Sequence, residues 1–201
     1  MISLTLGKAE LDILPVVRGL SSYADRINGI YGNYDRYAVS LSPEEIEGVR
    51  HRESIVDDYE PSEMDLVFAH RLSSFGEVTV PAPAWCAIVD LCDKDSKELI
   101  PLDMPDRQYT EIYCETVSSL EWVNEHRMAK KGMKKKFDMS SPEKFSEEWD
   151  DFVNRKKGFR EMINIRERYI SLRLTELSER EEKILAVIDC ERVRNILGMI
   201  S

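Results

Sequence analysis

The chain has 201 residues, of which 42% are hydrophobic and 33% are charged. These proportions are typical of a folded globular protein and exclude a largely disordered chain. The formal net charge of -10 argues against a general nucleic-acid binder, because phosphate contacts require clustered lysines and arginines. The local exception is the basic run from Arg127 to Lys136. For this run we favour a solvated loop or helix end over an anion-binding patch.

Sequence features also bear on location and redox chemistry. No apolar run approaches the roughly 20 residues that a transmembrane helix requires, and the first seven residues are too short for the apolar part of a signal sequence. We therefore expect a cytoplasmic protein without a membrane span. The four cysteines show neither zinc-site spacing nor the density of a disulfide scaffold. We interpret Cys86, Cys92 and Cys114 as small buried hydrophobic residues.

The first part of the chain predicts alternating strands and helices. Residues 2–6 alternate in polarity and predict a strand. A helix is expected to begin at Pro15, because apolar residues then recur at helical spacing. Residues 37–41 predict a second strand, and Ser42-Pro-Glu-Glu45 predicts the capped start of another helix. This alternation favours a parallel sheet with right-handed crossovers.

Two more strands and a long helical region are predicted in the rest of the chain. Ser62 is expected to cap a helix, and Pro83 to begin another. Residues 98–103 predict the third strand. After a stretch that is helical almost throughout, residues 183–188 predict the fourth strand, and residues 191–200 predict the closing helix.

Together these elements predict one α/β domain over residues 1–201. Its sheet is expected to be small and mainly parallel, with flanking helices and a large helical insertion, at about 107–180, before the last strand. Ligands of open α/β sheets lie beyond the carboxyl ends of the strands. Asp103 and Arg107 follow the third predicted strand, and residues 189–192 follow the fourth. These residues either form a site there or only pair with one another and cap the local turns.

The usual catalytic signatures are missing from the sequence. It contains no glycine-rich phosphate loop, no Gly-x-Ser-x-Gly elbow and no His-Glu-x-x-His motif. His51, His70 and His126 lack metal-ligand spacing. Cys190 would act as a nucleophile only if the adjacent helix lowered its pKa, and no histidine lies near it in sequence to act as the base.

Four segments carry a resemblance to a known family: Tyr37 to Glu47, Glu98 to Asp103, Ile165 to Ile170 and Lys183 to Ile196. In this order they resemble the Val-Ala-Val-Glu-Leu strand with its following helix, the second conserved strand, the Glu-Arg-Asp-x-x-Met helix segment and the terminal Val-Val-Gly-x-Gly-His strand and helix of the TraB/PrgY family. That family shares a superfamily with the Tiki proteases and is related to ChaN-like and erythromycin-esterase-like folds. The resemblance implies a small α/β sheet with a helical insertion, and a metal-dependent hydrolase site built from two Gly-x-x-His motifs and a glutamate.

The chain departs from the family's site at each of its key positions. Glu10 stands where the first motif has its histidine, and Ser40 stands where the strand has its glutamate. Arg192 stands where the second motif has its histidine, and arginine is no ordinary metal ligand because it stays protonated. Family-like side chains remain at Asp103, Arg166 and Glu167. We therefore expect no bound metal and no other cofactor.

These replacements favour a divergent TraB-like protein that has lost the metal-hydrolase site. It is expected to act as a ligand-binding or regulatory module rather than as an enzyme. The expected ligand is small and anionic or zwitterionic, because arginines recognise carboxylate and phosphate groups. The candidate ligand-binding residues are Glu10, Ser40, Asp103, Arg107, Arg166, Glu167 and Arg192.

Two alternatives remain open. The first is a metal-dependent or acid/base hydrolase in which Glu10 and Asp103 provide the carboxylates. The second is a structural subunit that forms a homo-oligomer or docks a partner through exposed helices. Trp122 and a stripe of Phe145, Trp149 and Phe152 would contribute to such docking, although core packing is the favoured interpretation of the stripe.

Overall fold

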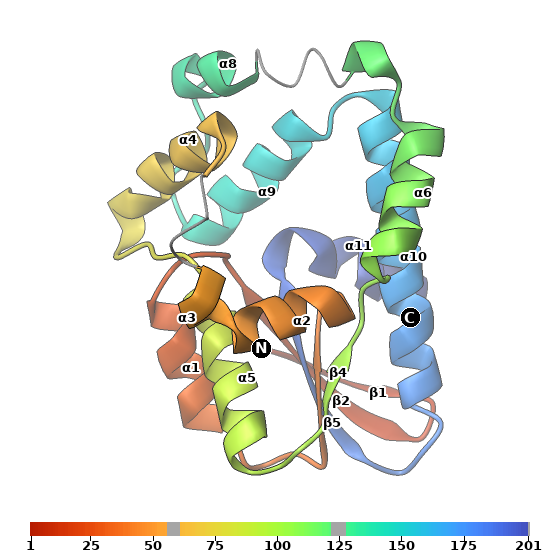
Figure 1. The fold of residues 1–201 in the computed structure, drawn as a ribbon. Helices are drawn as coiled ribbons and strands as arrows, with labels where there is room; N and C mark the ends of the chain where they lie inside the picture. The colour runs from red at the N-terminus through yellow and green to blue at the C-terminus, as the bar shows by residue number, and fades with distance from the viewer. Residues whose placement is uncertain (56–60, 122–127, 201) are drawn as a thin grey trace.

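The computed structural model describes residues 1–55, 61–121 and 128–200, and its five strands form one sheet in the order β1-β2-β5-β3-β4 (Figure 1). The strands are β1 (Ile2–Leu6), β2 (Ala9–Val16), β3 (Arg36–Val39), β4 (Leu99–Pro101) and β5 (Lys183–Asp189). β1 is antiparallel to β2, whereas the β2–β5, β5–β3 and β3–β4 pairs are parallel. The prediction of an α/β fold with a mainly parallel sheet is confirmed.

Helices make up most of the remaining structure. Those that the structure describes are α1 (Ser22–Ile30), α2 (Pro43–Arg50), α3 (Arg52–Ile55), α4 (Glu63–Leu72), α5 (Pro83–Lys94), α6 (Asp106–Thr116), α8 (Met128–Lys134), α9 (Pro142–Val153), α10 (Lys157–Leu177) and α11 (Cys190–Ile200), with a short 3-10 helix η2 (Ser73–Phe75). Four of them, α6, α8, α9 and α10, lie between β4 and β5 and form the predicted helical insertion. No helix in the described residues is both long and apolar enough to cross a membrane.

The first helix begins later than the sequence pattern predicts. Ala9–Val16 forms β2, the second arm of a hairpin with β1, and α1 begins only at Ser22. The hairpin turns at Gly7, where φ is +57° and an added Cβ would lie 2.6 Å from the Ser178 carbonyl oxygen, so the turn favours glycine. β2 alternates between apolar and acidic residues from Ala9 to Ile13, but its second half, Leu14-Pro15-Val16, is apolar throughout and lacks the alternation that distinguishes a strand from a helix. The predicted helix start at Pro15 is therefore wrong.

The predicted helix starts that depend on local capping are confirmed. The Ser42 hydroxyl accepts a hydrogen bond from the Glu45 N–H at 3.0 Å, and the Glu45 carboxylate accepts one from the Ser42 N–H at 2.8 Å. Ser62 makes the same reciprocal pair with Asp65 at the start of α4. Pro83 is the first residue of α5. These signals lie within one turn of chain, so the sequence alone reveals them.

Apolar side chains cover both faces of the sheet. α1 and α5 pack against one face, toward which Leu185 and Val187 of β5 point (Figure 1). α10 and α11 cover the other face, where Ile184, Ala186 and Ile188 belong to the second core cluster. Alternate residues of β5 thus enter opposite layers, as the two-residue period of a strand requires.

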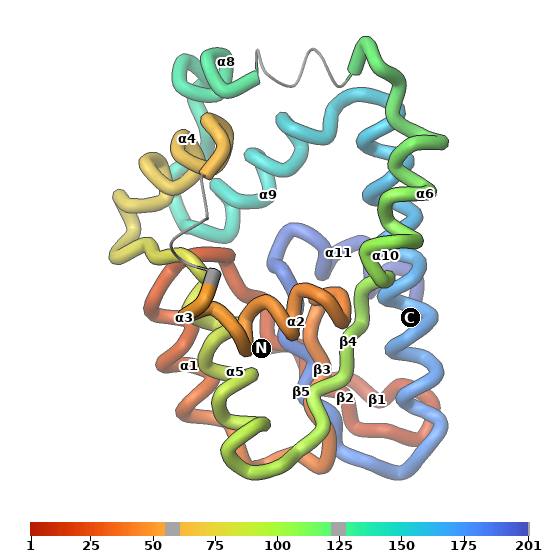
Figure 2. The backbone as a smooth tube through the Cα atoms, in the orientation of Figure 1, coloured from red at the N-terminus to blue at the C-terminus, as the bar shows by residue number. Residues whose placement is uncertain are grey.

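Helices α4, α8 and α9 pack together beyond the carboxyl ends of the strands (Figure 2). Phe145, Trp149 and Phe152 of α9 are buried, so their predicted role in core packing is confirmed. Phe68 of α4 stacks on Phe145, with the ring centroids 5.4 Å apart. Trp122, the other residue considered for docking, lies outside the described residues. The aromatic side chains therefore join α4 to α9.

The cysteine predictions are only partly correct. Cys92 is buried and Cys86 is partly buried, but Cys114 is exposed. Cys114 lies on α6, which packs along one side of α10 and has no fully buried residue. A cysteine on such a surface helix cannot serve as a core residue, so its predicted burial is wrong.

Candidate functional site

The carboxyl ends of four strands meet at one edge of the sheet, and each strand leads to a polar side chain there. Arg18 follows β2, Asp189 ends β5, Ser40 follows β3 and Asp103 follows β4. The chain continues from β2 to α1 on one face and from β5 to α11 on the other face. A crevice forms where neighbouring connections diverge in this way.

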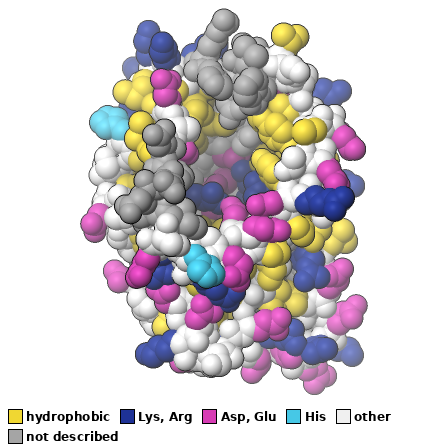
Figure 3. All heavy atoms as spheres, in the orientation of Figure 1, with side chains coloured by type: hydrophobic (Ala, Val, Ile, Leu, Met, Phe, Trp, Pro, Cys, Tyr) yellow, Lys and Arg dark blue, Asp and Glu magenta, His cyan; other side chains and the backbone are white. Residues whose placement is uncertain are grey.

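Two adjoining hollows lie at this edge and together form what we call the polar hollow. The first has a volume of about 270 Å³ and the second about 300 Å³, and both are lined by Arg18 and Arg166. Asp103 also lines the first, and Asp189 and Arg192 line the second. Figure 3 shows the recess between the helices, with basic and acidic side chains on its floor. The site is therefore open and strongly charged.

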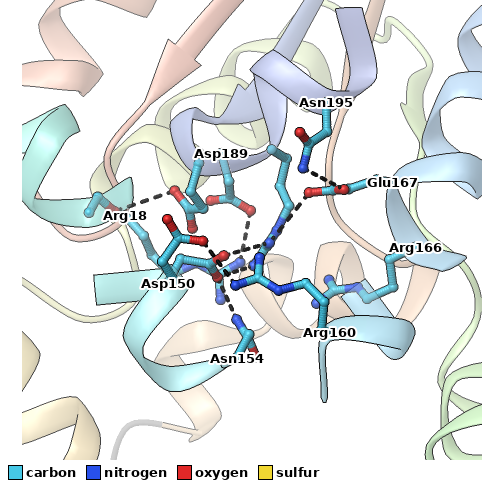
Figure 4. Close-up of polar contacts among 12 residues, drawn as sticks. Arg18, Asp150, Asn154, Arg160, Arg166, Glu167, Asp189 and Asn195 are labelled. Atoms are coloured by element: carbon cyan, nitrogen blue, oxygen red, sulfur yellow. Dashed lines mark hydrogen bonds and ion pairs between the residues drawn. The ribbon is translucent and has the colours of Figure 1, made fainter. Parts of the chain in front are cut away.

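Arg18 and Asp189 form an ion pair across the ends of β2 and β5 (Figure 4). The Arg18 Nη2 donates to Asp189 Oδ2 at 3.2 Å, and the Ser40 hydroxyl lies 3.3 Å from the same oxygen. The Ser40 hydroxyl also accepts a hydrogen bond from the Asp189 N–H at 3.1 Å. The negative charge of Asp189 raises the pKa of Arg18. Arg18 nevertheless keeps 48% of its side chain exposed, so a ligand can reach its guanidinium group.

A second ion pair joins the end of β4 to α10. Arg166 donates to Asp103 Oδ2 from Nε at 2.9 Å, and its Nη2 contacts the same oxygen. The other oxygen of Asp103 accepts a hydrogen bond from the Met104 N–H at 2.8 Å. Burial lowers the pKa of Arg166, but the charge and the hydrogen bonds of Asp103 act in the opposite direction, and the net shift is upward. Arg166 is thus a permanent cation that points its Nε and one Nη nitrogen at Asp103.

A third group of buried charges connects α11 to α9 and α10. Arg192 binds both carboxylate oxygens of Asp150, with Nη1 2.9 Å from Oδ2. Its Nη1 also lies 3.6 Å from an oxygen of Glu167. Asn195 donates to the other oxygen of Glu167 at 2.9 Å (Figure 4), and burial raises the pKa of that carboxyl. Arg192 therefore connects helices rather than presenting a free guanidinium group.

Glu191 lines the polar hollow and titrates near neutral pH. Loss of hydration, with the nearby Asp189 charge, raises the pKa of Glu191 to about 7. The hydroxyl of Ser146 and the thiol of Cys190 lie 3.3 Å and 3.4 Å from the same Glu191 oxygen. Burial raises the pKa of Cys190, so its thiol stays protonated and is a poor nucleophile. Glu191 has the acid/base properties that Cys190 lacks.

The structure brings together five of the seven candidate residues. Asp103, Arg166 and Arg192 line the polar hollow, whereas Ser40 and Glu167 lie beneath it, next to side chains that line it.

The other two candidates lie elsewhere, so their predicted place in the pocket is wrong. Glu10 is exposed and pairs in register with Lys183 at the opposite edge of the sheet. It lies near the start of β2 because the chain forms a hairpin at Gly7 instead of ending a strand there. Arg107 keeps 91% of its side chain exposed and donates to Glu111 at 3.1 Å on the surface of α6.

Sequence reasoning missed Arg18, Asp150 and Ser146 as parts of the site. Arg18 follows a strand whose apolar run was interpreted as the start of a helix, and the correct assignment of β2 would have revealed it. Asp150 and Ser146 lie on the same amphipathic helix, α9, as the aromatic stripe. No local signal distinguishes them from other polar residues of that helix, because their partners on α11 are distant in sequence.

The site does not fit the metal centre that the family resemblance implies. Glu10 lies at the wrong edge of the sheet, and Arg192 is a cation bound to Asp150. Within the described ranges, no group of three or more His, Cys, Asp or Glu residues is placed to hold a metal ion. No family model, curated protein or solved structure matches the chain. The TraB-like resemblance therefore remains a prediction.

Proposed function

We propose that the protein is a binding module for a small anionic or zwitterionic ligand, held in the polar hollow by Arg18. One observation carries the proposal: Arg18 lines both parts of the polar hollow and a third, adjoining hollow. In the described part of the chain, its guanidinium group donates to a single oxygen of Asp189. A guanidinium group has five N–H donors, and pairs of them bind carboxylate or phosphate oxygens. Arg18 thus has donors left for a ligand.

Asp189 supplies the complementary half of a zwitterion site. Its Oδ2 binds Arg18, whereas its buried Oδ1 has no hydrogen-bond partner among the described residues. A buried acceptor without a donor costs about 1–3 kcal/mol. After a small rotation of the Asp189 carboxylate, an ammonium or hydroxyl group of a ligand in the polar hollow would recover this cost, which favours a ligand that carries a donor beside its acidic group.

We also propose that the chain is a divergent TraB-like protein that has lost its metal-hydrolase site and serves a binding or regulatory role. The support is the order of the four family-like segments and the replacements at Glu10, Ser40 and Arg192. Arg192, a cation, stands at one of the family's metal-ligand positions, and Glu10, which stands at another, lies at the opposite edge of the sheet. These two replacements favour recognition of an anion over metal chemistry.

Replacing Arg18 with alanine is expected to weaken binding of a small anion or zwitterion by about 10- to 100-fold. The estimate follows from the roughly 1.5–3 kcal/mol of a hydrogen bond to a charged group. Isothermal titration calorimetry with acetate, inorganic phosphate and glycine measures the effect. Arg107→Ala is the matched control, because this exposed arginine lies outside the hollow. Equal affinities of wild type and Arg18→Ala for every probe would refute the proposal.

Acid/base hydrolysis is the second candidate function. The observation that favours it is the Ser146 hydroxyl 3.3 Å from the Glu191 carboxylate, a carboxyl whose pKa is about 7. A base with this pKa beside a hydroxyl is the arrangement that activates a serine nucleophile. Hydrolysis of p-nitrophenyl acetate is then expected to rise with pH around 7 in wild type and to lose this rise in Glu191→Gln. Turnover no faster than the buffer rate would exclude this candidate.

A further inference from the structure

A mainly apolar groove adjoins the polar hollow and shares Arg18 with it. The groove lies between α2, α4 and the segment that leads into α5, and it has a volume of about 400 Å³. Its apolar walls include Val49, Phe68, Val78 and Val80. Because Arg18 lines both spaces, a ligand anchored there can extend from the charged site into the groove.

The groove holds apolar surface that water still reaches. Val80 lines it with 62% of its surface exposed. Burying such surface under an apolar ligand is favourable, and each buried methylene group strengthens binding about fourfold. The groove therefore favours binding of a ligand that has an apolar body.

Trp85 adds a polar requirement to this apolar wall. The residue is 3% exposed and lines the groove, and its buried indole N–H has no acceptor among the described residues. Buried indole N–H groups normally have a hydrogen-bond partner. An oxygen acceptor on the ligand's apolar body would supply one after a small shift of the ring.

The charges around the groove limit the ligand's own charge. Arg18 is the cation of the lining, whereas Glu45 and Asp65 both contribute carboxyl groups. The two acidic side chains beside the arginine repel a doubly charged phosphate ester more strongly than a singly charged group. Among anions that could bind Arg18, a carboxylate therefore meets the weaker repulsion.

We propose that the ligand is a monocarboxylate amphiphile: its carboxylate binds Arg18, and its apolar body, which bears one oxygen acceptor near Trp85, occupies the groove. This proposal rests on the proposed function, because Arg18 is the anchor in both. It adds a ligand class, because the polar hollow alone would bind small anions whether or not they carry an apolar body.

Calorimetric titration with acetate, octanoate and N-hexanoylglycine tests the proposal. Octanoate is expected to bind at least about tenfold more tightly than acetate, because its chain enters the groove. N-hexanoylglycine, which carries a carbonyl acceptor, is expected to lose affinity in Trp85→Phe, whereas octanoate keeps its affinity. Val80→Asp is expected to remove the advantage of octanoate, and Leu66→Asp is the matched control, because Leu66 is 56% exposed and does not line the groove.

The outcomes separate this proposal from the proposed function. Equal affinities for acetate and octanoate, both lost in Arg18→Ala, would overturn the amphiphile and leave the anion site intact. An octanoate affinity that Arg18→Ala does not change would overturn both. If octanoate still binds Val80→Asp more tightly than acetate does, its alkyl chain lies outside the groove. This result would also overturn the amphiphile proposal.

Discussion

Replacing Arg192 with alanine is expected to lower the free energy of unfolding by roughly 3–5 kcal/mol, the usual cost of removing one partner from a buried ion pair. The Arg192 side chain is 11% exposed and its partner Asp150 is 14% exposed. Arg192 also lies 3.6 Å from the buried Glu167. Without the guanidinium group, two carboxyl groups from α9 and α10 remain buried without their counter-charge.

Urea unfolding followed by circular dichroism at pH 7 measures this loss. Arg107→Ala is the control and is expected to change stability by less than about 0.5 kcal/mol, because Arg107 is a surface residue. The double variant Arg192→Met/Asp150→Leu is expected to recover much of the loss, since apolar pairs often replace buried ion pairs at little cost. A loss below about 1 kcal/mol in Arg192→Ala would show that water reaches the pair and would contradict the prediction.

The expected instability also decides which arginine tests ligand binding. A change in binding after Arg192→Ala would be difficult to separate from disorder in α9, α10 and α11, which Arg192 connects. Arg18 is half exposed and forms an ion pair with Asp189 alone among the described residues. Its removal therefore reports on the ligand with less disturbance of the fold.

The sequence predicts the elements of this fold whose signals are local. Ser42 and Ser62 begin helices through contacts within one turn, and β5 is an unbroken apolar run between charged residues. The second half of β2 is also apolar, but the helical spacing of the apolar residues after Pro15 supports a helix just as well. Only its pairing with β1 and β5, which is not local, decides between the two.

The position of the site in the fold was predictable from the sequence, but the ion pairs within it were not. Asp103 was expected at a strand end, where its nearest arginine in sequence is Arg107. Its partner is instead Arg166, 63 residues away, because Arg107 points outward from α6. Arg192 was likewise predicted at the site, but its partner Asp150 belongs to a helix whose position depends on the tertiary fold.

The protein is expected to lose stability as the pH rises from 5 to 8, and Glu191 is the main cause. The Glu191 pKa is about 7 in the folded protein and about 4.5 as a free side chain. Between these values the folded protein holds a proton that the unfolded chain has released, so raising the pH favours unfolding. The expected loss is about 3 kcal/mol, at roughly 1.4 kcal/mol per unit of pKa difference.

Other carboxyl groups do not reverse this trend. Burial also raises the pKa of Glu45 and Glu167, which acts in the same direction. The carboxyl groups with lowered pKa values are Asp12, Glu121, Asp138 and Glu143. Their contribution to stability is present above about pH 4.5 and is lost only as the pH falls below it. The window from pH 5 to 8 therefore reports on the carboxyl groups whose pKa is raised.

Glu191→Gln is expected to flatten this pH dependence, because glutamine keeps the size of the side chain without its charge. The variant should match wild type at pH 5 and exceed its unfolding free energy by about 2–3 kcal/mol at pH 8, as measured by urea unfolding at both pH values. Glu111→Gln, at an exposed carboxylate paired with Arg107, is expected to leave the slope unchanged. An unchanged slope in Glu191→Gln would mean that Glu191 is ionised across the whole range, and the polar hollow would then lack a group that titrates near neutral pH.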